Sequence, residues 1–388
     1  MSEINTAFNG KRLKSARLYN GLTIADVAKA TDLSKQSISQ FETGKMEPKM
    51  ETLMKLARYL GFPREYFYEK ITKSILVGDT YFRSLSSITN KERLAQIEKV
   101  KILVGIYNVL QEYVFFPELK LYKQTDDIID VENLATKVRE YWGLKSEPIS
   151  NIINLMERNG VVVSSAATTI SEKEAKIDAF SQIQLVNGQP VAIVILGSEK
   201  DNAFRRNFSA AHELGHLLLD DYYDVSEMSK LEYKEMEDTM NRFAGALLIP
   251  KENYLKDLNN SSKSDLAFYI QLKKKYRVSA AALIVRAKQL EQISVNQYQY
   301  LMKQLSQKGY RKCEPYDKET PTIQPRYLKE AMRMIIEEDK ISSSEFLGDL
   351  SIYGLTLFTE VVEKILNLPE GYLNMNDKKC DMISLKRK

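Results

Sequence analysis

Two histidines four positions apart constrain this chain more than any other feature of its sequence. His212 and His216 are the only histidines among the 388 residues, and with Glu213 they form the pattern His-Glu-x-x-His. On a helix, side chains four positions apart project from the same face, so both imidazoles point at one site. Two core histidines are the alternative, but the pattern favours a pair of metal ligands.

Zinc chemistry assigns a role to the remaining residue of the pattern. A catalytic zinc ion takes three protein ligands and keeps a fourth position open. It lowers the pKa of water bound there towards neutrality, and a nearby carboxylate then takes the proton. Glu213 follows the first histidine directly and is placed to act as this general base. The pattern therefore predicts Zn²⁺ as cofactor and hydrolysis as the chemistry.

The third ligand must come from elsewhere in the chain. With no third histidine, the HExxHxxGxxH arrangement is excluded, and a carboxylate is the remaining choice. The downstream segment KEMEDTMNRFAGALLIP has a helical pattern and offers Glu235, Glu237 and Asp238. We favour Glu237, one helical turn before Asn241, and expect the Asn241 amide to hydrogen-bond a ligand.

Length and composition exclude several classes of protein. A chain of 388 residues suits two or three domains, and 44% hydrophobic with 28% charged residues is typical of a folded protein. No run of eighteen apolar residues is present, and the N-terminus lacks the apolar core of a signal peptide. Cys313 and Cys380 lie far apart and form no metal-binding pattern. We therefore expect a cytoplasmic protein without membrane contact.

The N-terminal segment is predicted to form four short helices. Residues 1–70 carry 12 Lys and Arg against 8 Asp and Glu, so their net charge of +4 equals that of the whole chain. A positive charge concentrated at one end points to a polyanionic partner. Helix start and stop signals place helices over residues 10–19, after the cap Thr23, from the cap Ser34 to Gly44, and over residues 50–60.

The second and third of these helices have the spacing of a DNA-reading motif. Two short helices joined by about three residues place the second one in the major groove. Ile38 and Phe41 point to the core, whereas outward amides, hydroxyls and lysines suit base edges and phosphates. A four-helix packing module with an ordinary polar face is the alternative. The predicted DNA-contacting residues are Thr23, Lys35, Gln36, Ser37, Ser39, Gln40 and Lys45.

The segment LTIADVAKATDLSKQSISQFETGKMEPKMETLMKLARYLGF carries a resemblance to a known family. It is similar from one end to the other to the XRE (Cro and phage-repressor type) helix-turn-helix, over about residues 8–70. The resemblance implies a double-stranded DNA operator as partner. It also implies binding as a homodimer, because operator half-sites lie about one DNA turn apart.

Between the two motifs the pattern changes from helical to alternating. Residues 89–114 are predicted to form one long helix that spaces the two halves or packs two protomers together. The runs VVVSS, DAFSQIQL and PVAIVIL are rich in β-branched or aromatic residues and are separated by turn signals. These runs predict a small sheet directly before the histidine motif.

Two motifs between about residues 151 and 251 carry a second resemblance. FSAAHELGHLLL and Glu237-x-x-x-Asn241 followed by RFAGALLIP are similar to the ImmA/IrrE family of metallopeptidases. This resemblance implies a gluzincin-like zinc site that cleaves a repressor protein, with His212, His216 and Glu237 as ligands and Glu213 as base. Members often continue LLL with histidine where Asp220 stands here, and we expect Asp220 to affect the surroundings of the ligands. The side chains available to polarise the scissile carbonyl are Tyr222, Tyr223, Arg205 and Arg206.

The C-terminal third is predicted to be mostly helical. Residues 262–293 have a second helix-turn-helix-like rhythm, with a basic segment before the cap Ser279. A helical support packed on the peptidase is favoured over a second DNA reader. A loop-rich stretch over residues 309–325 leads to a last helical unit over residues 328–366, and the tail is expected to be disordered.

We therefore predict a multidomain, mainly α-helical protein. It combines an all-α N-terminal helix-turn-helix, a central α+β zincin-like peptidase with a small sheet, and a C-terminal helical extension. The expected domains are residues 1–72, a helical linker over 73–145, the peptidase over 146–255 and the extension over 256–388. The expected function is a DNA-binding transcriptional regulator whose zinc metallopeptidase cleaves a repressor, itself or a partner. The alternative is a transcription factor whose peptidase-like domain is only a sensor or scaffold.

Overall fold

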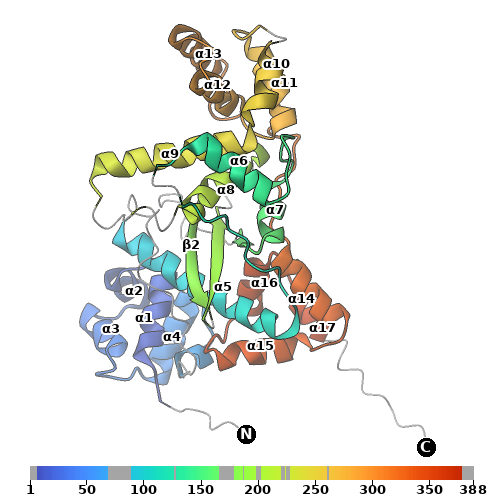
Figure 1. Ribbon diagram of the computed structural model, residues 1–388. Helices are drawn as coiled ribbons and strands as arrows, with labels where there is room; N and C mark the ends of the chain where they lie inside the picture. The colour runs from blue at the N-terminus through green and yellow to red at the C-terminus, as the bar shows by residue number, and fades with distance from the viewer. Residues whose placement is uncertain are drawn as a thin grey trace, which may run out of the picture.

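The structure, a computed structural model, describes residues 7–68, 89–125, 128–165, 179–186, 188–197, 202–219, 223, 228–259 and 262–377. Helices dominate these ranges, and three strands form one sheet in the middle of the chain (Figure 1). None of the described helices is long and apolar enough to cross a membrane. The mainly helical fold with a small central sheet, expected from the sequence, is confirmed.

The first helices form the N-terminal unit: α1 (Gly10–Tyr19), α2 (Ile24–Thr31), α3 (Lys35–Glu42), α4 (Met50–Leu60) and the 3-10 turn η1 (Arg64–Tyr68). Both predicted caps are present, because the side chains of Thr23 and Ser34 accept hydrogen bonds from backbone amides three residues on. A buried ion pair between Arg17 Nη2 and Glu42 Oε2, 2.9 Å apart, ties α1 to the end of α3.

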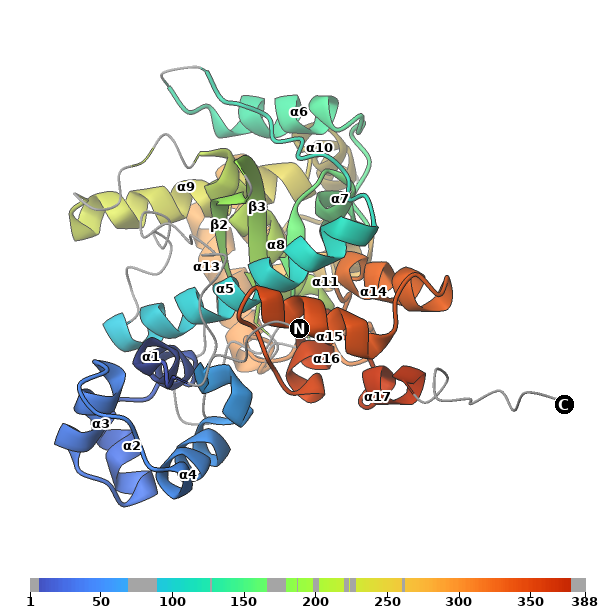
Figure 2. The ribbon, with the colours of Figure 1, turned by 90° about the horizontal axis from the view of Figure 1, so that it is seen from below.

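Helix α5 (Asn90–Tyr113) lies at the centre of the chain. Its residues 102–110 are all buried, so this part of the helix is covered on every side. It packs against α1 and against α14 (Tyr327–Glu337) and α15 (Ser343–Ile352). Figure 2 shows α1 near one end of α5 and α15 towards the other. The expected long helix is present, and it lies between the N-terminal unit and the C-terminal helices; its role as a spacer or a protomer interface stays a prediction.

The sheet has the strand order β1-β3-β2 and separates two hydrophobic cores. β1 (Val162–Ser164) is parallel and β2 (Ala179–Val186) antiparallel to the central β3 (Gln189–Leu196). Phe180 and Ile193 belong to a buried cluster that includes α5, whereas Ala192 and Val194 belong to one that includes α8 (Ala203–Leu218). Because successive strand residues face opposite sides, one sheet packs against both helices.

Helix α8 packs along α9 (Lys230–Leu248) with a close approach at Gly215. A Cβ atom at Gly215 would lie 3.0 Å from both Met240 Sδ and Phe243 Cδ1, so only glycine fits without movement. α6 (Val131–Tyr141) covers α9, and α7 (Ile152–Arg158) contacts α8 and β1. The buried side chains of Arg139 and Arg286 donate to carbonyl oxygens at the C-terminal end of α9, which fixes that end in place.

The remaining helices divide between the two cores. α10 (Lys251–Asn259), α11 (Leu266–Tyr276), α12 (Ala280–Gln289) and α13 (Val295–Gln307) share the cluster of α8 and α9 and project at the top of Figure 1. α14, α15, α16 (Thr359–Leu366) and α17 (Tyr372–Asp377) lie on the side of α5. The predicted domain boundaries stay proposals, and this division places residues 251–307 with the peptidase unit. Residues 378–388, the expected disordered tail, lie outside the described ranges.

Candidate metal centre and nucleic-acid interface

The histidine motif lies in the last two turns of α8, directly beside α9. Leu214 and Leu217 are buried in the core that α8 shares with the sheet and α9, and they anchor the helix. This packing leaves both imidazoles on the side towards Glu237 of α9.

Three side-chain atoms converge between the two helices. The Nε2 atoms of His212 and His216 lie 3.1 Å apart, and they lie 3.3 Å and 3.4 Å from the carboxylate oxygens of Glu237. The side chains are 12–28% exposed, so the site is open to solvent. Glu235 and Asp238, the other candidates for third ligand, are exposed and lie outside this group.

The separations within this group fit a tetrahedral zinc ion. Tetrahedral bonds of about 2.0–2.1 Å place neighbouring ligand atoms about 3.3–3.4 Å apart, and the observed distances agree within a few tenths of an ångström. Two imidazole nitrogens and one carboxylate with an open side form the donor set of a catalytic zinc site. The residues present therefore fit the metal that the sequence predicts.

Burial, charge and hydrogen bonds shift the pKa values of the candidate ligands. Burial raises the pKa of Glu237, but hydrogen bonds and charge from both imidazoles outweigh it and hold that pKa well below its usual range. Burial lowers the pKa of His212, but Glu237 and Glu213 outweigh it and raise that pKa overall. Asn241 Oδ1 lies 3.1 Å from His212 Nδ1 and can only accept a hydrogen bond. Nδ1 thus donates to Asn241, and Nε2 is the nitrogen that faces Glu237 and can bind a metal once its proton is lost.

Ser181 on β2 completes the surroundings of Glu213, and the sequence did not single it out. Its hydroxyl donates to Glu213 Oε2 at 2.7 Å and lies 3.1 Å from the Glu213 carbonyl oxygen. Both residues are buried. A serine in an alternating strand carries no chemical signal of its own. Only the packing of β2 on α8 reveals the contact.

Two of the four side chains predicted to polarise a substrate carbonyl form hydrogen bonds elsewhere in the chain. Arg205 donates to the carbonyl oxygen of Arg311, and Arg206 Nη2 donates to Gln324 Oε1 at 3.1 Å. Both arginines are therefore engaged with the segment over residues 311–324. Tyr223 is partly buried against the core around α8 and α9. Two further candidates, Tyr222 for this role and Asp220 near the ligands, lie outside the described residues.

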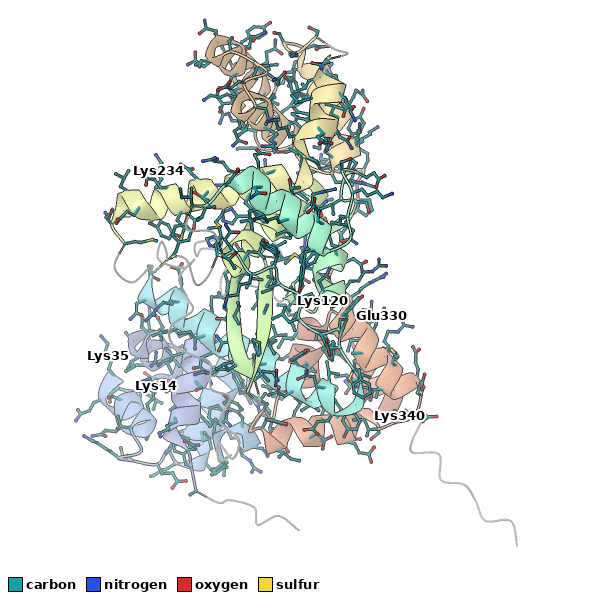
Figure 3. All side chains as sticks on the ribbon, in the orientation of Figure 1. Lys14, Lys35, Lys120, Lys234, Glu330 and Lys340 are labelled. Carbon is teal, nitrogen blue, oxygen red and sulfur yellow. The ribbon has the colours of Figure 1, made fainter. Side chains whose placement is uncertain are left out.

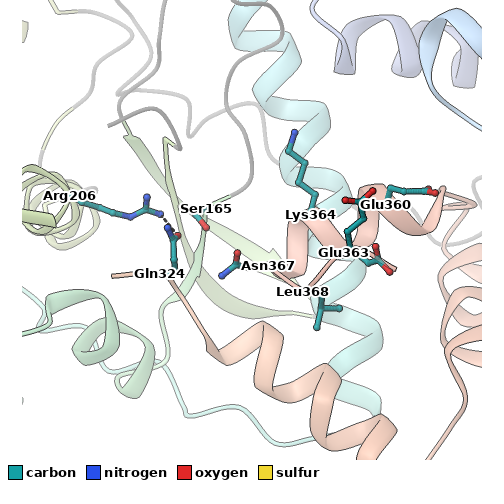
Figure 4. Close-up of a pocket in the computed structure, with 9 residues that line it drawn as sticks. Ser165, Arg206, Gln324, Glu360, Glu363, Lys364, Asn367 and Leu368 are labelled. Atoms are coloured by element: carbon teal, nitrogen blue, oxygen red, sulfur yellow. Dashed lines mark hydrogen bonds between the residues drawn. The ribbon is translucent and has the colours of Figure 1, made fainter. Parts of the chain in front are cut away.

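A cavity of about 430 Å³ lies near the start of α8, away from the ligands. Its lining includes Arg206 and Gln324 on one side and Lys364 and Asn367 of the C-terminal segment on the other (Figure 4). In Figure 4 the Arg206 side chain points towards Gln324. None of the three candidate ligands lines this cavity, so it is separate from the metal centre.

The predicted recognition helix α3 is presented to solvent. Its main contacts are with α1 and α2, and Lys35, Gln36 and Ser39 are exposed. Figure 3 shows Lys35 projecting from the outer side of the molecule. The hydroxyls of Thr23 and Ser37 are hydrogen-bonded within the two helix caps. Lys45 is also exposed, and Gln40 is half-buried. The amide and lysine side chains are thus better placed than these hydroxyls to contact DNA.

The basic segment of α11 is engaged within the chain. Lys273 is buried and forms ion pairs with Glu314 and Asp317. Lys274 lies 3.6 Å from the centre of the Tyr316 ring, and Lys275 pairs with Asp257 at 2.7 Å. Ser279 caps α12 as expected. These contacts favour a helical support over a second DNA-reading unit.

Comparison with known families agrees with the division of the chain. A helix-turn-helix family model matches residues 13–67, and the model of the IrrE N-terminal-like domain matches residues 167–288. No curated protein matches the chain. The protein thus combines a helix-turn-helix domain, of the DNA-binding class, with a peptidase-like domain. More narrowly, its resemblance to an XRE-type helix-turn-helix fused to an ImmA/IrrE-type peptidase domain is confirmed.

Proposed function

We propose that this chain is a DNA-binding regulator whose zinc peptidase site cleaves a repressor protein, itself or a partner, and so switches gene expression. The observation that carries the proposal is the convergence of His212, His216 and Glu237 in a chain that also contains a helix-turn-helix unit. We further propose a cytoplasmic homodimer on a double-stranded operator, because one recognition helix per half-site requires two copies. Cleavage in cis would fall between about residues 68 and 90, most of which lie outside the described ranges.

The chain's own side chains supply most of the proposed chemistry. A zinc ion, when bound, supplies a Lewis acid that polarises a carbonyl and acidifies water. His212, His216 and Glu237 would hold this ion, and Asn241 fixes the tautomer of His212. Glu213 takes the proton of the attacking water and passes it to the leaving amine.

One observation favours a second candidate, a regulator whose peptidase-like domain senses metal without turnover. The sheet lies between α8 and α5, and α5 in turn packs on α1 of the DNA-binding unit. Any shift of α8 on metal binding therefore has a packed route to the DNA-binding helices. Turnover distinguishes the two candidates.

Metal analysis tests the ligand assignment. We expect about one zinc per wild-type chain, and loss of zinc in His212→Ala and Glu237→Gln. Glu235→Gln and Asp238→Asn are matched controls, since both are exposed neighbours on α9, and should keep the metal. Equal zinc content in wild type and His212→Ala would contradict the assignment.

Footprinting around the protein's own gene tests DNA binding and turnover together. Gln36→Ala with Gln40→Ala should abolish protection, whereas Gln299→Ala, exposed on the distant α13, should not. Glu213→Gln should keep zinc and DNA binding but abolish cleavage of the repressor. Unchanged switching by Glu213→Gln would favour the sensor.

A further inference from the structure

We propose that Ser181 is a positioning residue that holds one oxygen of the Glu213 carboxylate, so that the other oxygen takes the proton. This assignment rests on the proposed peptidase function and adds a residue from β2 to its machinery. Ser181 does not contact the candidate ligands through any described hydrogen bond, so its role is exerted through Glu213.

The geometry commits the Ser181 hydroxyl to the carboxylate. A hydroxyl has one proton, and the nearer of its two acceptors is Glu213 Oε2 at 2.7 Å, against 3.1 Å to the backbone oxygen. A distance of 2.7 Å is the usual length of an O–H···O hydrogen bond, so this contact is well formed. Ser181 is 6% and Glu213 4% exposed, so water has little access to replace the bond.

Holding one oxygen matters because the two oxygens of a free carboxylate are equivalent and its side chain turns about three bonds. The peptide bond between His212 and Glu213 fixes only the backbone of the base. The hydrogen bond from β2 fixes its far end, and β2 is itself held by its pairing with β3, where Ser181 lies opposite Val194. A base held at both ends can meet the narrow positional tolerance of proton transfer.

Binding of acetohydroxamate provides a test that needs no peptide substrate. This small acid binds zinc through its two oxygens and gives its hydroxyl proton to a neighbouring carboxylate, so its affinity reports both the metal and the base. Zinc content and acetohydroxamate affinity are measured for the full-length zinc-loaded wild type and for Ser181→Ala, Ser181→Thr and Ser181→Cys. Ser343→Ala is the matched control, because Ser343 is buried in α15, outside the metal centre.

We expect unchanged zinc content and about tenfold weaker acetohydroxamate binding in Ser181→Ala, as for loss of one hydrogen bond to a charged group. Ser181→Thr keeps the hydroxyl and should restore wild-type affinity, and Ser343→Ala should equal wild type. Ser181→Cys keeps a weak donor at similar volume, so an intermediate affinity supports the assignment if Ser181→Ala does not fold. Equal affinities of wild type and Ser181→Ala overturn this assignment alone. A wild type without zinc overturns the proposed function and this assignment with it.

Discussion

Glu157 places a carboxylate at the junction between the two cores, where its burial should make stability depend on pH. Its Oε1 accepts hydrogen bonds from the backbone amides of Arg326 and Tyr327, both 2.9 Å long, at the N-terminus of α14. The residue is 2% exposed, and Oε2 has no hydrogen-bond partner among the described residues. Burial raises the pKa of Glu157 to about 7, in spite of these hydrogen bonds and the Arg326 charge.

The sign and size of the effect follow from this pKa. An acid whose pKa is higher in the folded chain than in the unfolded chain loses stability as the pH rises. The loss occurs between pH 4.5, the ordinary value, and about 7, and amounts to roughly 3 kcal/mol. Glu157→Gln keeps the accepting oxygen and cannot ionise. We expect it to match wild type below pH 4.5 and to be more stable by up to roughly 3 kcal/mol above pH 7.

Urea unfolding of both proteins on each side of this pH window measures the effect. The difference between variant and wild type is used, because all other titrating groups act equally in both. Glu330→Gln, an exposed glutamate of α14, is the control and should show no pH-dependent difference. The same pH dependence in wild type and Glu157→Gln would refute the reasoning.

Three further substitutions have defined outcomes. Arg17→Met leaves the buried Glu42 without its partner and should destabilise the N-terminal unit by about 3–5 kcal/mol in thermal unfolding; an unchanged midpoint speaks against a buried pair. Gly10→Ala puts a Cβ atom 2.1 Å from the Phe41 carbonyl oxygen, so it should displace α1 from α3 and abolish DNA binding in a gel-shift assay; wild-type binding contradicts this packing. Asn241→Ala should weaken zinc binding about 10–100-fold in competition with a chelator, and equal affinity means that the amide does not orient the ligand.

Features that depend on neighbours along the chain could be predicted from the sequence. Thr23 and Ser34 cap helices because their side chains reach amides only three residues away. The convergence of Glu237 with the two histidines was also predictable across more than twenty residues. Zinc chemistry accepts few residue types, and one turn of α9 offered only three carboxylates.

Features that depend on packing between distant segments could not be predicted in the same way. Ser181 meets Glu213 only because β2 lies on α8, and no local pattern encodes that contact. The burial of the middle of α5 did leave a signal in the sequence. The stretch ILVGIYNVL, residues 102–110, is apolar around the whole helix apart from one asparagine, which is typical of a helix buried on all sides.

The packing of α1 on α5 changes what a cut between them would do. In the sequence, α1 comes before residues 69–88, which join the DNA-binding unit to the rest, and α5 comes after them. The two helices nevertheless contact each other and share one buried cluster. Breaking the peptide chain there removes a covalent tie but exposes none of this apolar surface by itself. A nicked protein would therefore run as two bands on a denaturing gel and as one particle in native chromatography. For such a cut to act as a switch, the two pieces must also come apart, and the strength of the α1–α5 contact would set the delay between cleavage and response.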